Sequence, residues 1–174
     1  NNVPYIVMPL MSNGTLTDKL KNGPLSISEA IRIFTPIADA LDFAHKNSVL
    51  HRDVKPSNIL FDQNDNPFLA DFGIAKAMQS ASNLTGTGIV GTPDFMSPEQ
   101  ARGEQLDGRS DLYSLGVMIY QSLTGNPLFR ATTPIGVMLK HATESPPPIR
   151  EQRPDLSFEV EQVLDKALAK DPND

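Results

Sequence analysis

The sequence has no cysteine, no tryptophan and only three histidines among its 174 residues. Without cysteine, the chain can form no disulfide, no thiolate nucleophile and no cysteine-ligated zinc site, which fits a reducing, cytoplasmic setting. No apolar run approaches the roughly 20 residues that a membrane-spanning helix needs, and no signal peptide is visible. Few catalytic schemes remain beyond those that use carboxylate, amide, hydroxyl and lysine side chains.

Basic residues are also too few to balance the acidic ones. The chain carries 15 Lys and Arg against 21 Asp and Glu, for a formal net charge of −6, and its isoelectric point is about 5.0. This balance argues against a general nucleic-acid binder or a binder of anionic membranes. The length suits one domain with a sizeable core, and no internal repeat or interdomain linker is visible.

Two short motifs carry most of the information. Residues 51–58 have the pattern H-R-D-x-K-x-x-N, with Asp53, Lys55 and Asn58 as its chemically useful side chains. Further along the chain, residues 71–73 have the pattern D-F-G. Each pattern alone is weak, since a lone H-R-D can be a surface loop and a lone D-F-G a turn after a strand. Together, in this order, they indicate a phosphotransfer site.

The whole chain resembles eukaryotic-like protein kinases, and the residues of its motifs are most similar to those of bacterial serine/threonine kinases of the Hanks type. Residues 5–11 resemble the last strand of the small N-terminal lobe and the hinge after it. Residues 91–99 resemble the segment that positions the peptide substrate. Residues 111–116 resemble the start of the central helix of the large C-terminal lobe, and residues 170–172 resemble the segment before its last helix.

The resemblance implies an α+β kinase-like fold, with a mostly helical C-lobe, a short β-hairpin and the last N-lobe strand. It divides the chain into that strand (1–8), the hinge (9–14) and a C-lobe without its final helix (15–174). No G-x-G-x-x-G loop and no V-A-I-K strand occur in the sequence. We therefore expect an incomplete catalytic domain that is inactive alone.

The site roles follow from the resemblance and from the needs of phosphoryl transfer. Asp53 would orient the acceptor hydroxyl, and Lys55 would neutralise charge on the transferred phosphate. Thr92 would bond to the Asp53 and Lys55 side chains. Asn58 and Asp71 would bind Mg²⁺. Structural roles are expected for His51, Phe72, Gly73, Glu99 and Asp111, where Asp111 would cap amides of the catalytic loop. The Glu99 charge would lack its usual arginine partner. Such an unpaired charge lowers the stability of the fold if water is excluded from the site.

The nucleotide and the regulatory residues are assigned in the same way. Met8 would be the gatekeeper, Pro9 and Met11 would face the adenine of ATP through backbone groups, and Leu60 would form its floor. For Met8 and Leu60, plain core packing is the competing interpretation. An arginine before the catalytic aspartate marks kinases whose loop is ordered by phosphorylation. Arg52 would therefore pair with phosphate on Thr85 or Thr87.

Local patterns predict a mostly helical chain. Ser26 and Glu29 have the spacing of a capping box, and Pro36 indicates a kink in the helix that follows. The apolar face expected for that helix comprises Ile27, Ala30, Ile31, Phe34, Ile37, Ala38, Leu41 and Ala44. The other expected elements are a strand at 4–8, a small helix at 15–21, strands at 59–61 and 67–70, a flexible loop at 74–96, and helices at 110–124, 134–143 and 157–169.

Three functional classes remain open. The first is a serine/threonine protein kinase that uses ATP and Mg²⁺, acts on protein Ser or Thr hydroxyls and can pair with a second kinase copy in its full-length parent. The second is a pseudokinase-type module that binds partners without transferring phosphate. The third is an autonomous C-lobe protein. A small-molecule kinase of the aminoglycoside type is remote, because such enzymes lack the segment seen at 91–99. The retained Asp53, Lys55, Asn58 and Asp71 favour the first class.

Overall fold

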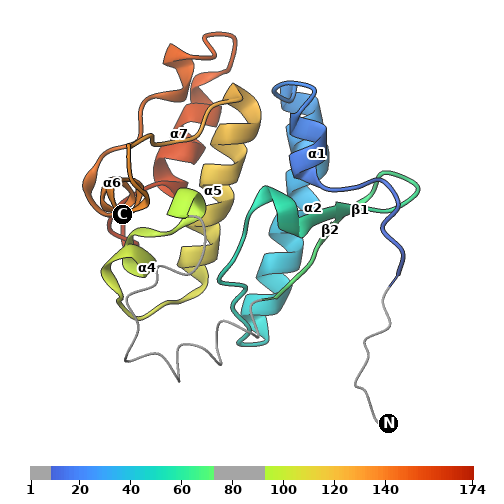
Figure 1. Ribbon diagram of the computed structural model, residues 1–174, viewed down its shortest axis with the longest axis horizontal. Helices are drawn as coiled ribbons and strands as arrows, with labels where there is room; N and C mark the ends of the chain where they lie inside the picture. The colour runs from blue at the N-terminus through green and yellow to red at the C-terminus, as the bar shows by residue number, and fades with distance from the viewer. Residues whose placement is uncertain (1–8, 73–92) are drawn as a thin grey trace.

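The chain folds into a helical body that carries one small antiparallel hairpin (Figure 1). This computed structural model describes residues 9–72 and 93–174. The expected strand at 4–8 and most of the expected loop at 74–96 lie outside the described residues. The elements are α1 (Leu16–Leu20), α2 (Ile27–Lys46), η1 (Pro56–Asn58), β1 (Ile59–Phe61), β2 (Pro67–Leu69), η2 (Pro93–Phe95), α4 (Pro98–Arg102), α5 (Gly108–Thr124), α6 (Pro134–Thr143), η3 (Ile149–Glu151) and α7 (Phe158–Ala167).

Helix α2 begins where its capping box predicts. The Ser26 side chain accepts a hydrogen bond from the Glu29 amide, and the Glu29 carboxylate accepts one from the Ser26 amide. These bonds satisfy donors that have no partner inside the helix. The helix continues through Pro36 to Lys46. The predictions of one long helix here and of a mostly helical fold are confirmed.

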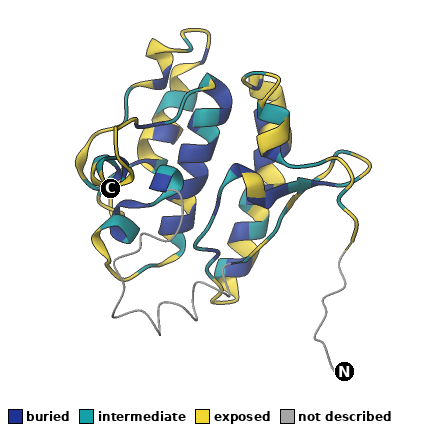
Figure 2. Cartoon of the chain, in the orientation of Figure 1, coloured by how far each residue is buried: buried dark blue, intermediate teal, exposed yellow. Residues whose placement is uncertain are grey.

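The core lies where α2 and α5 pack against each other, with the hairpin on α2 and α7 on α5 (Figures 1 and 2). Helix α5 buries residues on nearly all of its faces, as its apolar interior predicts. It begins at Gly108, two positions before the predicted start, because the Asp107 side chain caps it by accepting from the Arg109 amide. Helix α5 therefore lies at the centre of the core and packs against both α2 and α7.

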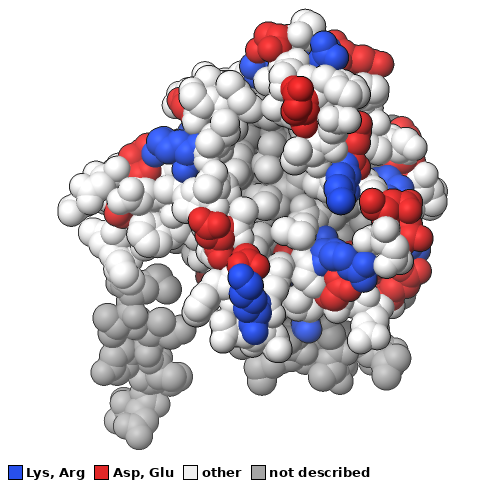
Figure 3. Space-filling view, turned by 180° about the vertical axis from the view of Figure 1, so that it is seen from behind, with Lys and Arg blue, Asp and Glu red and all other residues white. Residues whose placement is uncertain are grey.

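The apolar face of α2 differs from the prediction at three positions. Ile33 is buried although it was not predicted, whereas Ile27 and Ile31 are 38% and 60% exposed. The two exposed side chains border an apolar groove between α2, α5 and α7. A view from behind shows a recessed area without charged side chains in the middle of that face (Figure 3). The spacing of these residues places them on one side of the helix, but it does not show how much of that side α5 and α7 cover.

The turn of the hairpin forms ion pairs with two helices, α1 and α2. Strands β1 and β2 pair in the register Ile59 with Leu69 and Phe61 with Pro67. The Asp65 carboxylate in the turn accepts from Lys19 of α1 at 2.5 Å and from Arg32 of α2 at 2.7 Å. These bonds fasten the hairpin to both helices. Because the hairpin connects residues 58 and 71, its placement also sets the geometry of the segments at its two ends.

Replacing Asp65 with Asn should lower the free energy of unfolding by about 1 kcal/mol, since it removes two partly exposed ion pairs. The Lys19 side chain, bonded to Asp65, lowers the pKa of that carboxyl. The contribution of the Asp65 carboxylate to the free energy of unfolding is therefore present above the pKa that this group has in the unfolded chain. It is lost as pH falls through the lower pKa of the folded state. Urea denaturation between pH 7 and pH 3 should show a smaller loss of stability in Asp65→Asn than in the natural chain. If the free energy of unfolding fell equally with pH in Asp65→Asn and in the natural chain, Asp65 would not have this role.

The segment after α7 is anchored by Lys170. Its Nζ donates to Tyr113 Oη at 2.7 Å and to the His141 carbonyl at 3.1 Å, and it lies over the Tyr113 and Phe129 rings. Burial lowers the pKa of Lys170 to about 8 and that of His141 to about 4. These contacts tie the end of the described chain to α5 and α6. No helix in the described parts of the chain is long and apolar enough to cross a membrane.

Candidate active site

The loop that contains the H-R-D motif is held by the carboxylate of Asp111 on α5. Asp111 is 1% exposed. Its Oδ2 accepts from the His51 amide at 2.8 Å, and its Oδ1 accepts from the Arg52 amide at 2.7 Å. Arg52 has a φ of 65°, in the left-handed region that a non-glycine residue rarely adopts. The two bonds therefore hold a backbone conformation that would otherwise be unfavourable.

His51 connects the loop to the end of the hairpin. Its ring is fully buried, with Nε2 bonded to the Ala70 carbonyl at 2.9 Å and Nδ1 accepting from the Asp53 amide. Burial lowers the pKa of His51, so the imidazole is neutral near pH 7. The Phe72 ring packs on it, with the ring centroids 4.7 Å apart. Both ring nitrogens of His51 are therefore bonded to neighbouring backbone groups.

Asp53, Lys55 and Asn58 converge at the centre of the site. Lys55 Nζ donates to Asp53 Oδ2 at 2.7 Å, and Asn58 Nδ2 donates to the Asp53 carbonyl at 2.8 Å. Asn58 is nearly fully buried, whereas the Asp53 and Lys55 side chains are 25% and 34% exposed. The fixed amide of Asn58 thus supports a carboxylate and an ammonium group that an approaching substrate can reach.

Asp71 and Asn58 lie at the two ends of the hairpin, which joins them across the sheet. The Ala70 amide donates to the Asn58 carbonyl at 2.8 Å, so the residue before Asp71 lies beside Asn58. Asp71 is exposed and has a φ of 59°. Asn58 Nδ2 bonds to the Asp53 backbone, and Asn58 Oδ1 accepts one long bond of 3.4 Å from Ser57 Oγ, so this oxygen keeps a lone pair for a ligand. A carboxylate and an amide oxygen fit Mg²⁺, which needs one or two protein ligands beside phosphate and water.

Of the described residues expected at the adenine site, Leu60 lies in β1, whereas Pro9 and Met11 lie in the segment before α1. Pro9 is exposed and Met11 is half-buried. The Asn13 amide donates to the Phe61 carbonyl, and the Phe61 amide donates to the Gly14 carbonyl. These bonds bring the segment after Met11 alongside β1, where the half-buried Leu60 bridges to Thr15. Met8, Gly73, Thr85, Thr87 and Thr92 lie outside the described residues.

Glu99 has a hydrogen-bond partner, although no ion pair to it occurs among the described residues. Glu99 is 7% exposed on α4, and Ser110 Oγ of α5 donates to its Oε1 at 2.5 Å. A neutral hydroxyl takes the place of the expected cation at this oxygen. The sequence separation of Glu99 and Ser110 is too large for a local pattern to reveal the bond.

Helix α4, which the sequence patterns did not predict, holds the loop at a second point. Ser97 and Gln100 form a capping box, and Gln100 Nε2 also donates to the Arg52 carbonyl at 3.1 Å. The S-x-x-Q spacing of these residues is a recognisable signal for a helix start. Arg52 Nε is buried without a hydrogen-bond partner among the described residues. This guanidinium atom therefore has donor capacity left for a ligand.

His45 near the end of α2 is a further supporting residue that the sequence did not indicate. Its Nε2 lies 2.8 Å from Asp111 Oδ2, and the carboxylate accepts this bond. Gly108 of α5 approaches the same ring so closely that a Cβ there would lie 2.7 Å from His45 Nδ1. The glycine leaves the space in which the imidazole can reach Asp111.

Gly108→Ala should therefore lower the free energy of unfolding by about 1–3 kcal/mol, the usual cost of forcing atoms into a packed site. Helix propensity alone predicts the opposite sign, since Ala is the better helix former. Urea denaturation of Gly108→Ala, His45→Ala and the double variant would separate the two effects. In the His45→Ala background the alanine should be neutral or stabilising. An equal loss in both backgrounds would show that the clash with His45 is not the cause.

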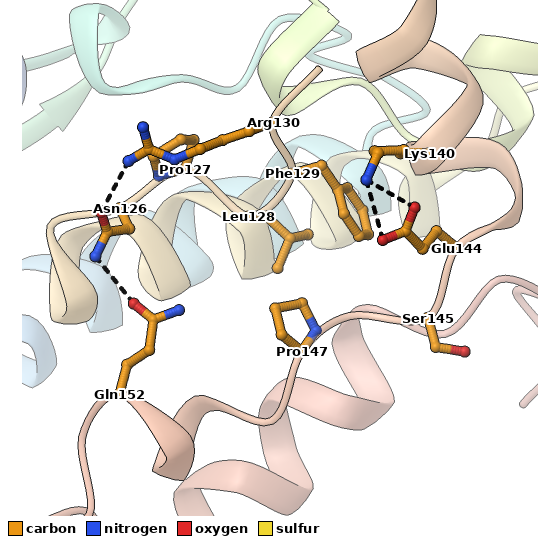
Figure 4. Close-up of a pocket in the computed structure, with 10 residues that line it drawn as sticks. All are labelled: Asn126, Pro127, Leu128, Phe129, Arg130, Lys140, Glu144, Ser145, Pro147 and Gln152. Atoms are coloured by element: carbon orange, nitrogen blue, oxygen red, sulfur yellow. Dashed lines mark hydrogen bonds and ion pairs between the residues drawn. The ribbon is translucent and has the colours of Figure 1, made fainter.

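A separate hollow of about 550 Å³ lies between the α5–α6 connection and η3. Asn126 bridges Arg130 and Gln152 on one side of it, and Lys140 pairs with Glu144 on the other (Figure 4). None of the described residues that are expected to act on phosphate lines this hollow. The hollow is therefore separate from Asp53, Lys55, Asn58 and Asp71.

Comparisons with known proteins show which family the chain is similar to. The model of the family described as "Protein kinase domain" matches residues 1–174. The chain is 41% identical over 172 residues to the serine/threonine-protein kinase PknB of Mycobacterium leprae, and 42% identical over 174 residues to PknB of Mycolicibacterium smegmatis. A probable serine/threonine-protein kinase of Clostridium acetobutylicum is 38% identical over 172 residues. Each alignment covers 98% of this chain but only 26–28% of the relative, so the chain spans about a quarter of the length of these relatives.

Proposed function

Because the chain belongs to the protein kinase family, and the relatives it matches are serine/threonine-protein kinases, we propose that it transfers the γ-phosphate of ATP to Ser or Thr hydroxyls of proteins. Its site is the loop around Asp53. The observation that carries the proposal is the convergence of Lys55 Nζ and Asn58 Nδ2 on Asp53. A carboxylate, an ammonium group and a metal-binding amide within one short loop are the groups that phosphoryl transfer requires.

In the proposed reaction, Asp53 accepts a hydrogen bond from the acceptor hydroxyl and aligns its oxygen with the γ-phosphorus. The oxygen–phosphorus bond forms, the bond to the bridging oxygen of ADP breaks, and Asp53 takes the hydroxyl proton. Lys55, held beside Asp53, neutralises charge that builds up on the transferred phosphate. Thr92 is proposed to bond to Asp53 and Lys55. His51 and Asp111 keep the loop in place and touch no substrate.

Asn58 and Asp71 are the residues proposed to hold Mg²⁺. Their side-chain oxygens would hold the ion, which would supply positive charge to offset that of the ATP phosphates. The backbone at Pro9 and Met11 is proposed to face the adenine, with Met8 and Leu60 packed against it. Arg52, whose Nε has no partner among the described residues, is proposed to bind a phosphate on Thr85 or Thr87.

The 174 residues alone are proposed to be inactive. Relatives of this chain are about four times longer, and in the kinase family a Gly-rich loop and a strand lysine hold the ATP phosphates from above. Neither pattern occurs in this sequence. The activity measurements below therefore concern the full-length natural protein.

The proposal is tested by metal dependence. In the full-length protein, Asp71→Ala should raise the KM for Mg·ATP at least about tenfold and lower kcat, because a hard oxygen ligand is lost. Asn58→Ala should also lose activity, and raised Mg²⁺ should restore part of it. The measurement is transfer of labelled phosphate from ATP to a Ser/Thr protein acceptor over a Mg²⁺ titration, followed by identification of the phosphorylated residue type.

Asp39→Ala is the matched control, since Asp39 is an exposed carboxylate on α2. It should keep the activity and Mg²⁺ dependence of the natural protein. Unchanged kinetics in both Asp71→Ala and Asn58→Ala would remove these residues from the metal site. No phosphate transfer by the natural protein, with partner binding retained, would instead favour the pseudokinase-type alternative.

A further inference from the structure

The sequence contains two Asn-Gly dipeptides, Asn13-Gly14 and Asn22-Gly23. They lie on the two sides of α1, and the structure describes both. In such a dipeptide the backbone nitrogen of the glycine can attack the side-chain amide of the asparagine, because glycine has no side chain that obstructs the approach. The two dipeptides offer the same reactive groups in one fold, so their surroundings can be compared directly.

The two asparagine side chains do not differ in a way that would favour one of them. Asn13 and Asn22 are both exposed, and neither side chain forms a hydrogen bond within the described parts of the chain. Each side-chain amide can therefore turn toward the backbone nitrogen that follows it. Water also reaches both positions. Exposure alone predicts similar reactivity for the two residues.

The two glycine amides do differ. The Gly23 amide donates to the Leu20 carbonyl at 3.2 Å, at the end of α1. It must give up this bond before its nitrogen can attack Asn22. The Gly14 amide has no hydrogen-bond acceptor among the residues that the structure describes. The nitrogen that would act as the nucleophile is therefore free at Gly14 and engaged at Gly23.

We propose that Asn13 is a site of spontaneous deamidation and that the hydrogen bond of Gly23 protects Asn22. The Gly14 nitrogen bonds to Asn13 Cγ, the bond from Cγ to Nδ2 breaks, and Nδ2 leaves as ammonia with the proton of the Gly14 amide. Water then opens the cyclic imide. Opening at Cγ gives aspartate, and opening at the main-chain carbonyl gives isoaspartate. The net reaction consumes one water and releases one ammonia.

The isoaspartate product would disturb a joint between the segment before α1 and β1. The Asn13 amide donates to the Phe61 carbonyl at 3.1 Å, and the Phe61 amide donates to the Gly14 carbonyl at 3.0 Å. Isoaspartate adds one atom to the main chain between these two bonds, so the bonds cannot both keep their present geometry. The same joint brings the segment after Met11 alongside β1. A weaker affinity for Mg·ATP should follow, and this consequence alone rests on the proposed kinase function.

The test is peptide mapping by mass spectrometry of the full-length natural protein, incubated in the folded state at mildly alkaline pH. Synthetic peptides that contain each dipeptide with its own neighbours are incubated alongside as references. The ratio of the Asn13 rate to the Asn22 rate is taken in the protein and divided by the same ratio in the peptides. The quotient should be about two- to tenfold above one, the rate equivalent of giving up one amide hydrogen bond. Isoaspartate should be found at position 13.

Asn13→Gln should remove the reaction at position 13, because the larger ring that glutamine requires forms far more slowly. Asn22→Gln is the matched control and should leave the rate at Asn13 unchanged. A quotient of one or less, or an unmodified Asn13 while its peptide reacts, would overturn the proposal.

The consequence for the nucleotide is measured separately, as the rise in the KM for Mg·ATP during incubation. This rise should be larger in the natural protein than in Asn13→Gln. Equal rises with isoaspartate present would overturn the effect on ATP alone. Absence of phosphate transfer by fresh protein would overturn the proposed function, whereas the mass spectra would still decide the modification.

Discussion

Asp53→Asn should lower the kcat of the full-length protein by about two orders of magnitude or more, the upper range for an acid–base residue. The amide has nearly the same shape as the carboxylate, but it cannot take the hydroxyl proton. It also loses the charged bond with Lys55 Nζ, now 2.7 Å long. The KM for Mg·ATP should change little, because Asp53 is proposed to contact the acceptor and not the nucleotide. Steady-state kinetics with varied ATP and varied acceptor would measure both quantities.

Asp42→Asn provides the matched control for this experiment. Asp42 is an exposed carboxylate on α2 that pairs with Lys46, four residues along the same helix. Its replacement makes the same chemical change away from the catalytic loop and should leave kcat unaltered. Near-normal turnover in Asp53→Asn would exclude Asp53 from the mechanism. A large rise in the KM for Mg·ATP with little loss of kcat would instead assign it to nucleotide binding.

The elements that sequence patterns predicted well are those whose causes are local. The bonds of the Ser26–Glu29 capping box span three residues, so the start of α2 could be read from the sequence. The hairpin could be read for the same reason, since the turn-rich residues 62–66 separate two short apolar runs. Helix α6 begins and ends where predicted, between Pro134 and Thr143. Each of these signals lies within a few positions of the element it defines.

The features that were missed depend on contacts between distant parts of the chain. His45 and Gln100 support the catalytic loop by bonding to Asp111 and to the Arg52 carbonyl. Nothing within their local sequence indicates those partners. The Glu99–Ser110 bond and the exposure of Ile31 likewise depend on how α5 and α7 pack. Of the groups that hold the loop in place, Asp111 was thus indicated by a motif, whereas His45 and Gln100 were not.

The left-handed backbone at Arg52 explains why this support matters. A φ of 65° at a non-glycine residue costs free energy and persists only when the surroundings fix it. Asp111 bonds to the Arg52 amide and Gln100 bonds to its carbonyl, so both sides of the residue are fixed. Asp53 follows directly in the chain. Its orientation therefore depends on groups from α4 and α5 that take no part in the proposed chemistry.

Asp111→Ala should lower the free energy of unfolding by about 3–5 kcal/mol, the range seen when one partner of a buried charged network is removed. The change leaves three donors without their acceptor, namely the His51 amide, the Arg52 amide and His45 Nε2. Each buried donor without a partner costs about 1–3 kcal/mol. Single domains have a total stability of only about 5–15 kcal/mol. The variant should therefore unfold at clearly lower urea concentration.

Loss of kinase activity in Asp111→Ala should exceed what unfolding explains, because the loop would relax even in molecules that stay folded. Asp111→Asn should fall between the natural protein and the alanine variant, since its amide oxygen can still accept one of the three bonds. Asp107→Asn is the control, because Asp107 caps the same helix but is half exposed and does not touch the loop. The measurements are urea denaturation and kcat at a temperature at which all variants are folded. If Asp111→Ala kept natural stability and turnover, the carboxylate would not be what holds the catalytic loop.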